Sequence, residues 1–265
     1  MQVTIIGSGN VATVLGRVLV NKGNKVDKVY SRDLHHAEIL ANELGAEAIN
    51  DLQEADGSAD LYLVAVTDDA LAEIAARLSL KNKLVVHTAG SVSKEILKNA
   101  SNNYGVLWPM KMIRKQMTTL EPVSIVVDGS SAETIIQIEN LARLFSPNIS
   151  RADDAQRAKM HMLAALTSNF ANHLYQLASD YCAAEGIDFS VFYPIIEETA
   201  LGLHQAAPSN LQAGPAFRGD RQTIQKHLAL LQAYPQISRV YEMMSKSIAE
   251  SFPEKKHAST PEKPR

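Results

Sequence analysis

The chain has 265 residues, of which 46% are hydrophobic and 21% charged, with a formal net charge of -3. This composition allows a full hydrophobic core in one large or two ordinary domains. The scattered basic residues exclude nucleic acid as an expected partner. No apolar run approaches the roughly 20 residues that cross a bilayer, and the chain opens without a signal core, so we expect no membrane partner and a cytoplasmic location.

Strand-forming and helix-forming segments alternate through the first half of the chain. Strands are predicted at residues 2–6, 25–30, 47–49, 61–66, 84–87, 105–108 and 123–127, with helices between them, one of them at residues 69–78. This alternation is typical of βαβ units. The sequence therefore predicts an α/β domain at residues 1–152, with a Rossmann-type, doubly wound and mostly parallel sheet.

The strand pattern stops after about Asp153. Helices are predicted at residues 155–185, 189–203 and 221–252, which indicates an all-helical second domain at residues 153–252. Residues 253–265 lack an apolar face, so we expect a disordered tail. The only cysteine, Cys182, lies in a predicted helix interior, where packing is a better interpretation than a nucleophile. The adjacent pair His35-His36 lacks further ligands, so no metal site is predicted.

A glycine-rich turn, Gly7-Ser8-Gly9-Asn10-Val11-Ala12, follows the first predicted strand and opens a helix. Gly7 can make the tight turn, Gly9 leaves room for a diphosphate, and Ala12 lets the helix pack closely on the strand. The N–H groups of the first helical turn would face the phosphates. These six residues are therefore predicted to bind a dinucleotide, and the alternative is an ordinary glycine-rich turn.

The end of the second predicted strand indicates which dinucleotide is preferred. An acidic residue there would bind the ribose hydroxyls of NAD, whereas Arg can bind a 2′-phosphate. Here the strand ends in Ser31-Arg32, a hydroxyl followed by a guanidinium, which favours NADP as the cofactor. Asp33 is one residue late for the acidic role, so NAD stays possible, and Arg32 could also be a solvated loop charge.

The predicted strand at residues 61–66 ends at the same edge of the sheet. Val66 and Thr67 are expected beside the ribose on the adenine side of the cofactor. Asp68 or Asp69, which follow, could be the N-cap of the next helix.

The next predicted strand ends in His87-Thr88-Ala89, which we expect where the nicotinamide would lie. His87 is thus a candidate cofactor-binding and catalytic residue, and the alternative is a histidine whose ring holds a loop in place. The following strand ends in Trp108-Pro109, a rigid turn beside the cleft.

A polar set lies on the first predicted helix of the second domain. The α-helical period places His161, Ser168 and Asn169 roughly on one face, among small residues that suit a substrate cleft. His161 is the candidate general acid, with Asn169 as a second catalytic residue and Ser168 as a substrate contact. Lys159 is an alternative proton donor on another face, and all these residues could instead be polar groups at an interface.

Residues 214–220 are predicted to form a loop before a helix that starts near residue 221, with Asp220 as its N-cap and Thr223 in its first turn. Arg218 could bind a substrate carboxylate bidentately, and Asp220 is grouped with it as a substrate-site residue. The alternative is that Arg218 and Asp220 pair and brace the loop. His227 could reach the same cleft or lie on the surface.

The first half resembles the NADP-binding domain of pyrroline-5-carboxylate, deazaflavin-dependent NADP and ketopantoate reductases. The motifs concerned are the glycine turn, Ser31-Arg32, and residues 64–69 and 87–90. The second half, through residues 161–169 and 214–220 with Thr223 and His227, is similar to the helical domain of a bacterial group of NADP oxidoreductases, of the 6-phosphogluconate dehydrogenase C-terminal type. The resemblance implies a reductase and a homodimer through the helical domains. It also implies that His161 takes the place of a lysine that, with an asparagine, acts in related hydroxyacid dehydrogenases.

The function expected from these residues is hydride transfer between NADPH and a carbonyl or imine carbon of a small, carboxylated substrate. Two alternatives stay open. The protein could transfer hydride to a flavin or deazaflavin, or it could be a regulatory or scaffold protein that binds NADP without turnover.

Overall fold

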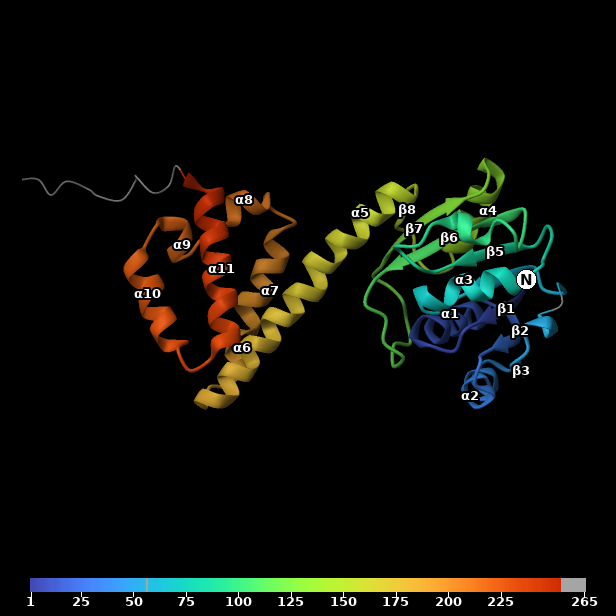
Figure 1. Ribbon diagram of the computed structural model, residues 1–265, viewed down its shortest axis with the longest axis horizontal. Helices are drawn as coiled ribbons and strands as arrows, with labels where there is room; N and C mark the ends of the chain where they lie inside the picture. The colour runs from blue at the N-terminus through green and yellow to red at the C-terminus, as the bar shows by residue number, and fades with distance from the viewer. Residues whose placement is uncertain (56, 254–265) are drawn as a thin grey trace, which may run out of the picture. The chain divides into compact units, whose positions relative to one another are not determined.

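The computed structural model describes residues 1–55 and 57–253, and it divides into two compact units, residues 1–168 and 169–265 (Figure 1). Of the predicted tail at residues 253–265, all but the first residue lies outside the described residues. No helix of the described part is long and apolar enough to cross a membrane. Each unit is described by itself below.

The first unit is built on an eight-stranded sheet in the order β3-β2-β1-β4-β5-β6-β7-β8. All neighbouring strands are parallel except β6 and β7, which confirms the predicted mostly parallel sheet. The strands are β1 (Gln2–Ile6), β2 (Lys25–Tyr30), β3 (Glu47–Ile49), β4 (Leu61–Val64), β5 (Leu84–His87), β6 (Asn103–Met110), β7 (Ser124–Gly129) and β8 (Ile149–Arg151). Since β1 lies between β2 and β4, the strand order reverses there, and such a switch point is where ligands bind in open α/β sheets.

Helices cover both faces of this sheet. On one face, α1 (Asn10–Asn21), α2 (Leu34–Leu44) and α4 (Ala132–Ala142) contribute to one hydrophobic core. On the other face, α3 (Asp68–Arg77) and the 3₁₀ turns η1 (Leu52–Glu54) and η2 (Lys94–Leu97) form a second core. Successive strand residues such as Val85 and Val86 pack into opposite cores, because neighbouring side chains of a strand point to opposite faces of the sheet.

The helical elements after β8 depart from the sequence prediction in three places. The helix expected at 155–185 contains a π-helical segment between two α-helices. The helix expected at 221–252 is interrupted before Pro235. Proline has no N–H to donate within a continuous helix, so it lies in the first turn of a new one. The expected loop at 214–220 contains a one-turn helix. The elements are α5 (Asp154–Ala164), η3 (Ala165–Phe170), α6 (Ala171–Glu185), η4 (Phe189–Phe192), α7 (Tyr193–Gly202), α8 (Pro208–Leu211), α9 (Pro215–Arg218), α10 (Arg221–Leu230) and α11 (Pro235–Ser251).

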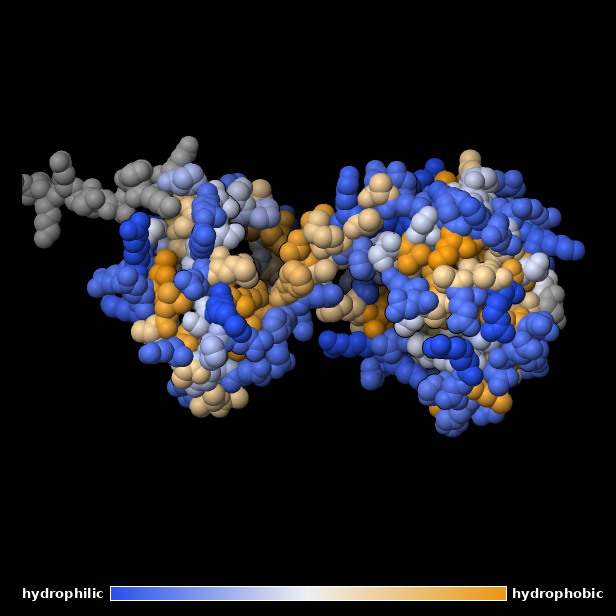
Figure 2. Space-filling view, viewed as in Figure 1, coloured by the Kyte–Doolittle hydropathy of each residue, from blue (hydrophilic) through white to orange (hydrophobic). Residues whose placement is uncertain are grey.

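The second unit has a very small core. Among its described residues, only Leu177, Cys182, Ala216 and Leu231 are buried, so Cys182 has the buried position expected of a packing residue. Large apolar side chains such as Val191, Ile195 and Leu230 are instead 60% or more exposed, and Figure 2 shows apolar residues at the surface of this unit. Large exposed apolar patches are typical of interaction surfaces, so this unit offers a surface suited to further apolar contacts.

Buried ion pairs attach the start of α5 to the sheet. Arg157 on α5 is 1% exposed and donates to Asp128 of β7 at 3.1 Å, to the Val92 carbonyl at 2.9 Å and to Asp154. Lys94 donates to the same Asp128 carboxylate at 2.9 and 3.0 Å. These contacts make α5 part of the first unit, which ends at residue 168, whereas the sequence predicts a boundary after residue 152.

We predict that Arg157→Leu lowers the free energy of unfolding by about 3 kcal/mol, because it leaves Asp128 buried beside a single cation. The matched control is Arg151→Leu, which removes a guanidinium that also bonds a carboxylate, that of Glu139, but is 60% exposed; this change should have little effect. Urea unfolding followed by circular dichroism measures both. Equal losses in the two variants would contradict the importance of the buried pairs.

Candidate active site

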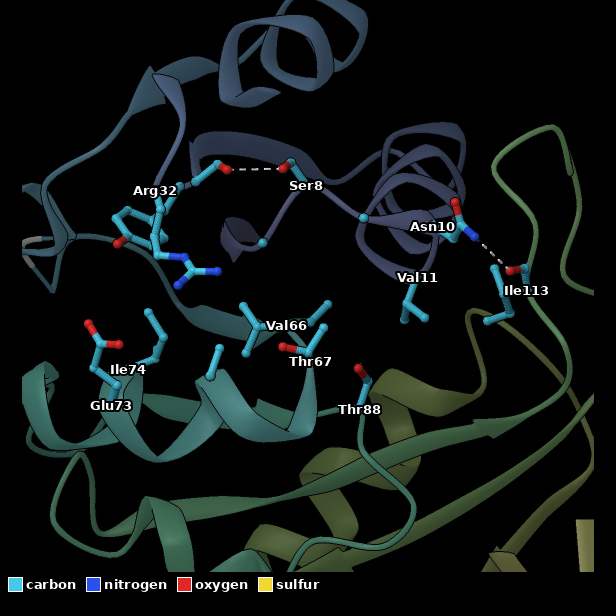
Figure 3. Close-up of a pocket in the computed structure, with 16 residues that line it drawn as sticks. Ser8, Asn10, Val11, Arg32, Val66, Thr67, Glu73, Ile74, Thr88 and Ile113 are labelled. Atoms are coloured by element: carbon cyan, nitrogen blue, oxygen red, sulfur yellow. Dashed lines mark hydrogen bonds between the residues drawn. The ribbon is translucent and has the colours of Figure 1, made fainter. Parts of the chain in front are cut away.

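A cavity of about 410 Å³ lies at the carboxyl ends of β1, β2, β4 and β5 (Figure 3). Ten of the residues predicted to bind the cofactor line it: Gly7, Ser8, Gly9, Asn10, Val11, Ser31, Arg32, Val66, Thr67 and Thr88. Six lining residues were not predicted as site residues: Tyr30, Ala65, Ala70, Glu73, Ile74 and Ile113. Residues from separate segments of the chain thus surround one space at the switch point of the sheet.

Gly7 is required by the fold itself. Its φ is +123°, and a Cβ atom there would lie 2.2 Å from the Ala65 carbonyl oxygen. Its N–H donates to the Tyr30 carbonyl at 2.8 Å. No side chain fits this position, so glycine lets the turn lie between the ends of β2 and β4.

Gly9 is not required by the fold. Its φ of -78° suits any residue, and a Cβ atom there would have no neighbour within 4 Å. Gly9 is also the N-cap of α1 and gives no side-chain cap, and the first turn has no acidic residue. The helix therefore presents uncapped N–H groups to the cavity, which is favourable for an anion that approaches closely.

The serine and arginine predicted at the end of β2 also face the cavity. The Ser8 hydroxyl donates to Ser31 at 3.1 Å, and the Arg32 guanidinium points into the space (Figure 3). Asp33 does not line the cavity, because its carboxylate is the N-cap of α2 and accepts from the His35 N–H at 2.9 Å. The charged group that the end of β2 contributes to the cavity is thus a cation, which suits the 2′-phosphate of NADP.

The start of α3 corrects the expectation for the two aspartates. Thr67 is the N-cap, and Asp68 and Asp69 lie in the first turn, where the helix dipole stabilises a carboxylate. Asp68 accepts from the Ser91 hydroxyl at 2.6 Å.

The loop after β6 closes another side of the cavity, because Asn10 donates to the Ile113 carbonyl at 3.2 Å.

Three residues predicted at the cofactor do not line the cavity. Ala12 is fully buried where α1 packs on the sheet, and Ala89 follows the lining residue Thr88. His87 is fully buried, and its Nδ1 accepts from the Ala89 N–H at 3.2 Å. Burial, and then the nearby charge of Arg157, lower the pKa of His87 to about 4. The ring is therefore neutral at pH 7 and holds the turn after β5.

His161 lies beside the end of β6. Its ring centroid is 5.7 Å from that of Trp108, and Gly90 gives Trp108 its space, since a Cβ atom at residue 90 would lie 2.5 Å from the indole. The imidazole is exposed, unlike that of His87. Ser168 and Asn169 lie within η3, where the helix is π-helical, so the α-helical period used to place them on the face of His161 does not hold through this segment.

In the second unit, Asp220 is the N-cap of α10, as predicted. Its carboxylate accepts from the Thr223 N–H at 3.0 Å and hydroxyl at 2.7 Å, and these bonds lower its pKa. Arg218 is exposed, and no ion pair joins it to Asp220 within the described part of the chain. The Nδ1 atom of His227 lies 2.7 Å from the Tyr241 hydroxyl, at the edge of an apolar pocket.

The glycine turn, the uncapped helix and the cation at the switch point define a Rossmann-type dinucleotide-binding protein. Residues 2–91 match a family described as NADP oxidoreductase, coenzyme F420-dependent, and residues 123–248 match a domain of unknown function, DUF2520. A structure from Bacteroides fragilis, provisionally described as an NADP oxidoreductase, is 36% identical, with a TM-score of 0.86 over 94% of this chain and 98% of that one. The chain belongs to this family of NADP oxidoreductases, as its motifs indicated.

More distant structures share the fold. An imine reductase from Myxococcus stipitatus in complex with NADP⁺ has 15% identity and a TM-score of 0.67 over 95% of this chain and 94% of that one. A 1-pyrroline-5-carboxylate reductase from Streptococcus pyogenes has 15% identity and a TM-score of 0.63 over 94% of this chain and 98% of that one. A comparison with curated proteins finds no match.

The buried His87 predicts a loss of stability in mild acid. Its pKa of about 4 lies below the ordinary 6.5, so on acidification the unfolded chain takes up the proton first. The stability present above pH 6.5 is therefore lost as the pH falls toward 4, and between pH 8 and 5 this loss is about 2 kcal/mol. Urea unfolding across this range should show a steeper loss for the wild type than for His87→Asn, whose amide oxygen can still accept from Ala89. The same pH dependence of the unfolding free energy in the two proteins would contradict this role of His87.

Proposed function

We propose that the protein transfers hydride from NADPH, bound in the cavity at the switch point, to a carbonyl or imine carbon of a small, carboxylated substrate. The observation that supports this most directly is the combination of an uncapped helix N-terminus at Gly9 with the Arg32 cation in the same cavity. When bound, the cofactor supplies the hydride, and the protein orients it and provides the proton.

In this proposal, each end of the cavity binds a different part of the cofactor. The N–H groups of residues 7–12 bind the diphosphate, and Ser8, Ser31 and Arg32 bind the 2′-phosphate. Val66 and Thr67 lie along the ribose on the adenine side. Thr88 and Ala89 lie at the nicotinamide, in a turn that His87 positions from the core.

The proposed proton donor is His161. Its exposed imidazole lies against Trp108, beside the turn after β5, and histidine is the side chain that most often acts as a general acid in enzymes. His161 would donate a proton to the oxygen or nitrogen of the substrate as its carbon accepts the hydride that NADPH supplies. Asn169 and Ser168 are proposed to bind the reacting group, and Arg218, with Asp220, the substrate carboxylate. The imine and pyrroline-carboxylate reductases of the same fold act on C=N bonds by their names.

We also propose that the protein forms a homodimer through its helical unit. This unit buries only four side chains among its described residues, and it exposes many large apolar ones. Contact with the same unit of a second copy would complete its core.

A second candidate is hydride transfer between NADP and a deazaflavin. The specific observation behind it is that the family description of the first unit names coenzyme F420.

The cofactor assignment predicts that Arg32→Ala weakens NADPH binding roughly 10- to 100-fold, because a charge-assisted bond to the 2′-phosphate is lost. NADH lacks that phosphate, so its affinity should fall much less, and it serves as the control ligand for the same variant. Fluorescence titration of both reduced cofactors measures this. Equal losses for NADPH and NADH would remove Arg32 from the phosphate site.

The reaction predicts NADPH oxidation in the presence of a member of a panel of keto acids, cyclic imines and deazaflavins. With the substrate found, His161→Gln should lower kcat roughly 100-fold while NADPH affinity is unchanged, because the proton donor is lost. His204→Gln, which alters an exposed histidine of the other unit, is the control. Tight NADPH binding with no turnover on any compound would contradict the proposal and favour a regulatory protein.

A further inference from the structure

The cavity extends beyond the glycine turn along one face of α3. Ala70, Glu73 and Ile74 line this part, at the three- and four-residue spacings that share a helix face. Ile74 is 3% exposed, whereas the Glu73 carboxylate lies at the rim with 59% of its side chain exposed. Figure 3 shows Glu73 and Ile74 on one side of the space and Arg32 on the other.

These groups suit a flat base with one polar edge. Val66 and Ile74 form an apolar wall, and the planar guanidinium of Arg32 lies across the space from them. A guanidinium stacks well on an aromatic ring. A carboxylate at the rim can only accept hydrogen bonds, so it pairs with an amino group and repels a carbonyl at the edge of a base.

A cation lies beside the Glu73 carboxylate. Arg77, one turn further along α3, lies 3.8 Å from Glu73 and 3.7 Å from Asp51 at the start of η1. Arg77 thus lies between two carboxylates of separate elements. The Arg77 guanidinium lies near one oxygen of Glu73, and the other oxygen can still accept a hydrogen bond.

We propose that Glu73 accepts a hydrogen bond from the 6-amino group of adenine and so selects an adenine dinucleotide over one whose purine has a carbonyl there. This inference depends on the proposed binding of NADPH in the same cavity. The diphosphate and the 2′-phosphate then supply affinity at Gly9 and Arg32, and Glu73 supplies selectivity for the base.

The test compares the dissociation constants of NADPH and of its reduced deamino analogue, in which hypoxanthine replaces adenine. The wild type should prefer NADPH roughly 10-fold or more, since the analogue places a carbonyl against the carboxylate. In Glu73→Gln the amide can donate to that carbonyl, so the preference should fall to near one or reverse. Glu133→Gln, an exposed change on α4 outside the cavity, should keep the wild-type ratio.

A second variant keeps the inference testable if Glu73→Gln does not fold. Arg77→Met keeps the carboxylate but removes the cation beside it, so the preference for NADPH should fall part of the way. An unchanged ratio in Glu73→Gln would overturn the inference. Equal tightening of both ligands would also overturn it, because the carboxylate would then act on the phosphates. If the wild type binds neither ligand, the proposed function itself fails, which is a different result from binding without selectivity.

Discussion

The contact between Gly7 and the Ala65 carbonyl is the constraint on which the site depends. Because no Cβ atom fits within 2.2 Å of that oxygen, only glycine lets the chain leave β1 and turn directly into α1. That turn places the start of α1 beside the ends of β2 and β4. The uncapped amides, Arg32 and the α3 face then surround one cavity, although they come from three separate segments.

The two units are stabilised in different ways. The first has large cores on both faces of its sheet and a balanced set of buried charges around Asp128 and Arg157. The second has few buried side chains among its described residues and exposes many large apolar ones. The homodimer proposed above would give these apolar side chains a partner surface.

The sequence predicts local features well and tertiary ones poorly. The seven predicted strands and the glycine turn depend on patterns a few residues long, as does the N-cap at Asp220, and the structure confirms them. The short edge strand β8 (Ile149–Arg151) was not predicted. The interruption of the helix before Pro235 and the π-helical segment at Ser168 were missed because the α-helical period was extended through them. Glu73 and Ile113 could not be found, since they reach the cavity only when α3 and the loop after β6 pack beside it. The burial of His87 likewise depends on its neighbours.

The most direct measurement is a calorimetric titration of NADPH into the wild type and into Gly9→Val. Position 9 has room for a side chain and an ordinary φ, so the variant should unfold at the wild-type temperature. The wild type should give saturable heat with one cofactor per chain, and the folded variant should give none, because its side chain occupies the place of the diphosphate. An absence of heat in the wild type, or equal affinity in the two proteins, would contradict the account.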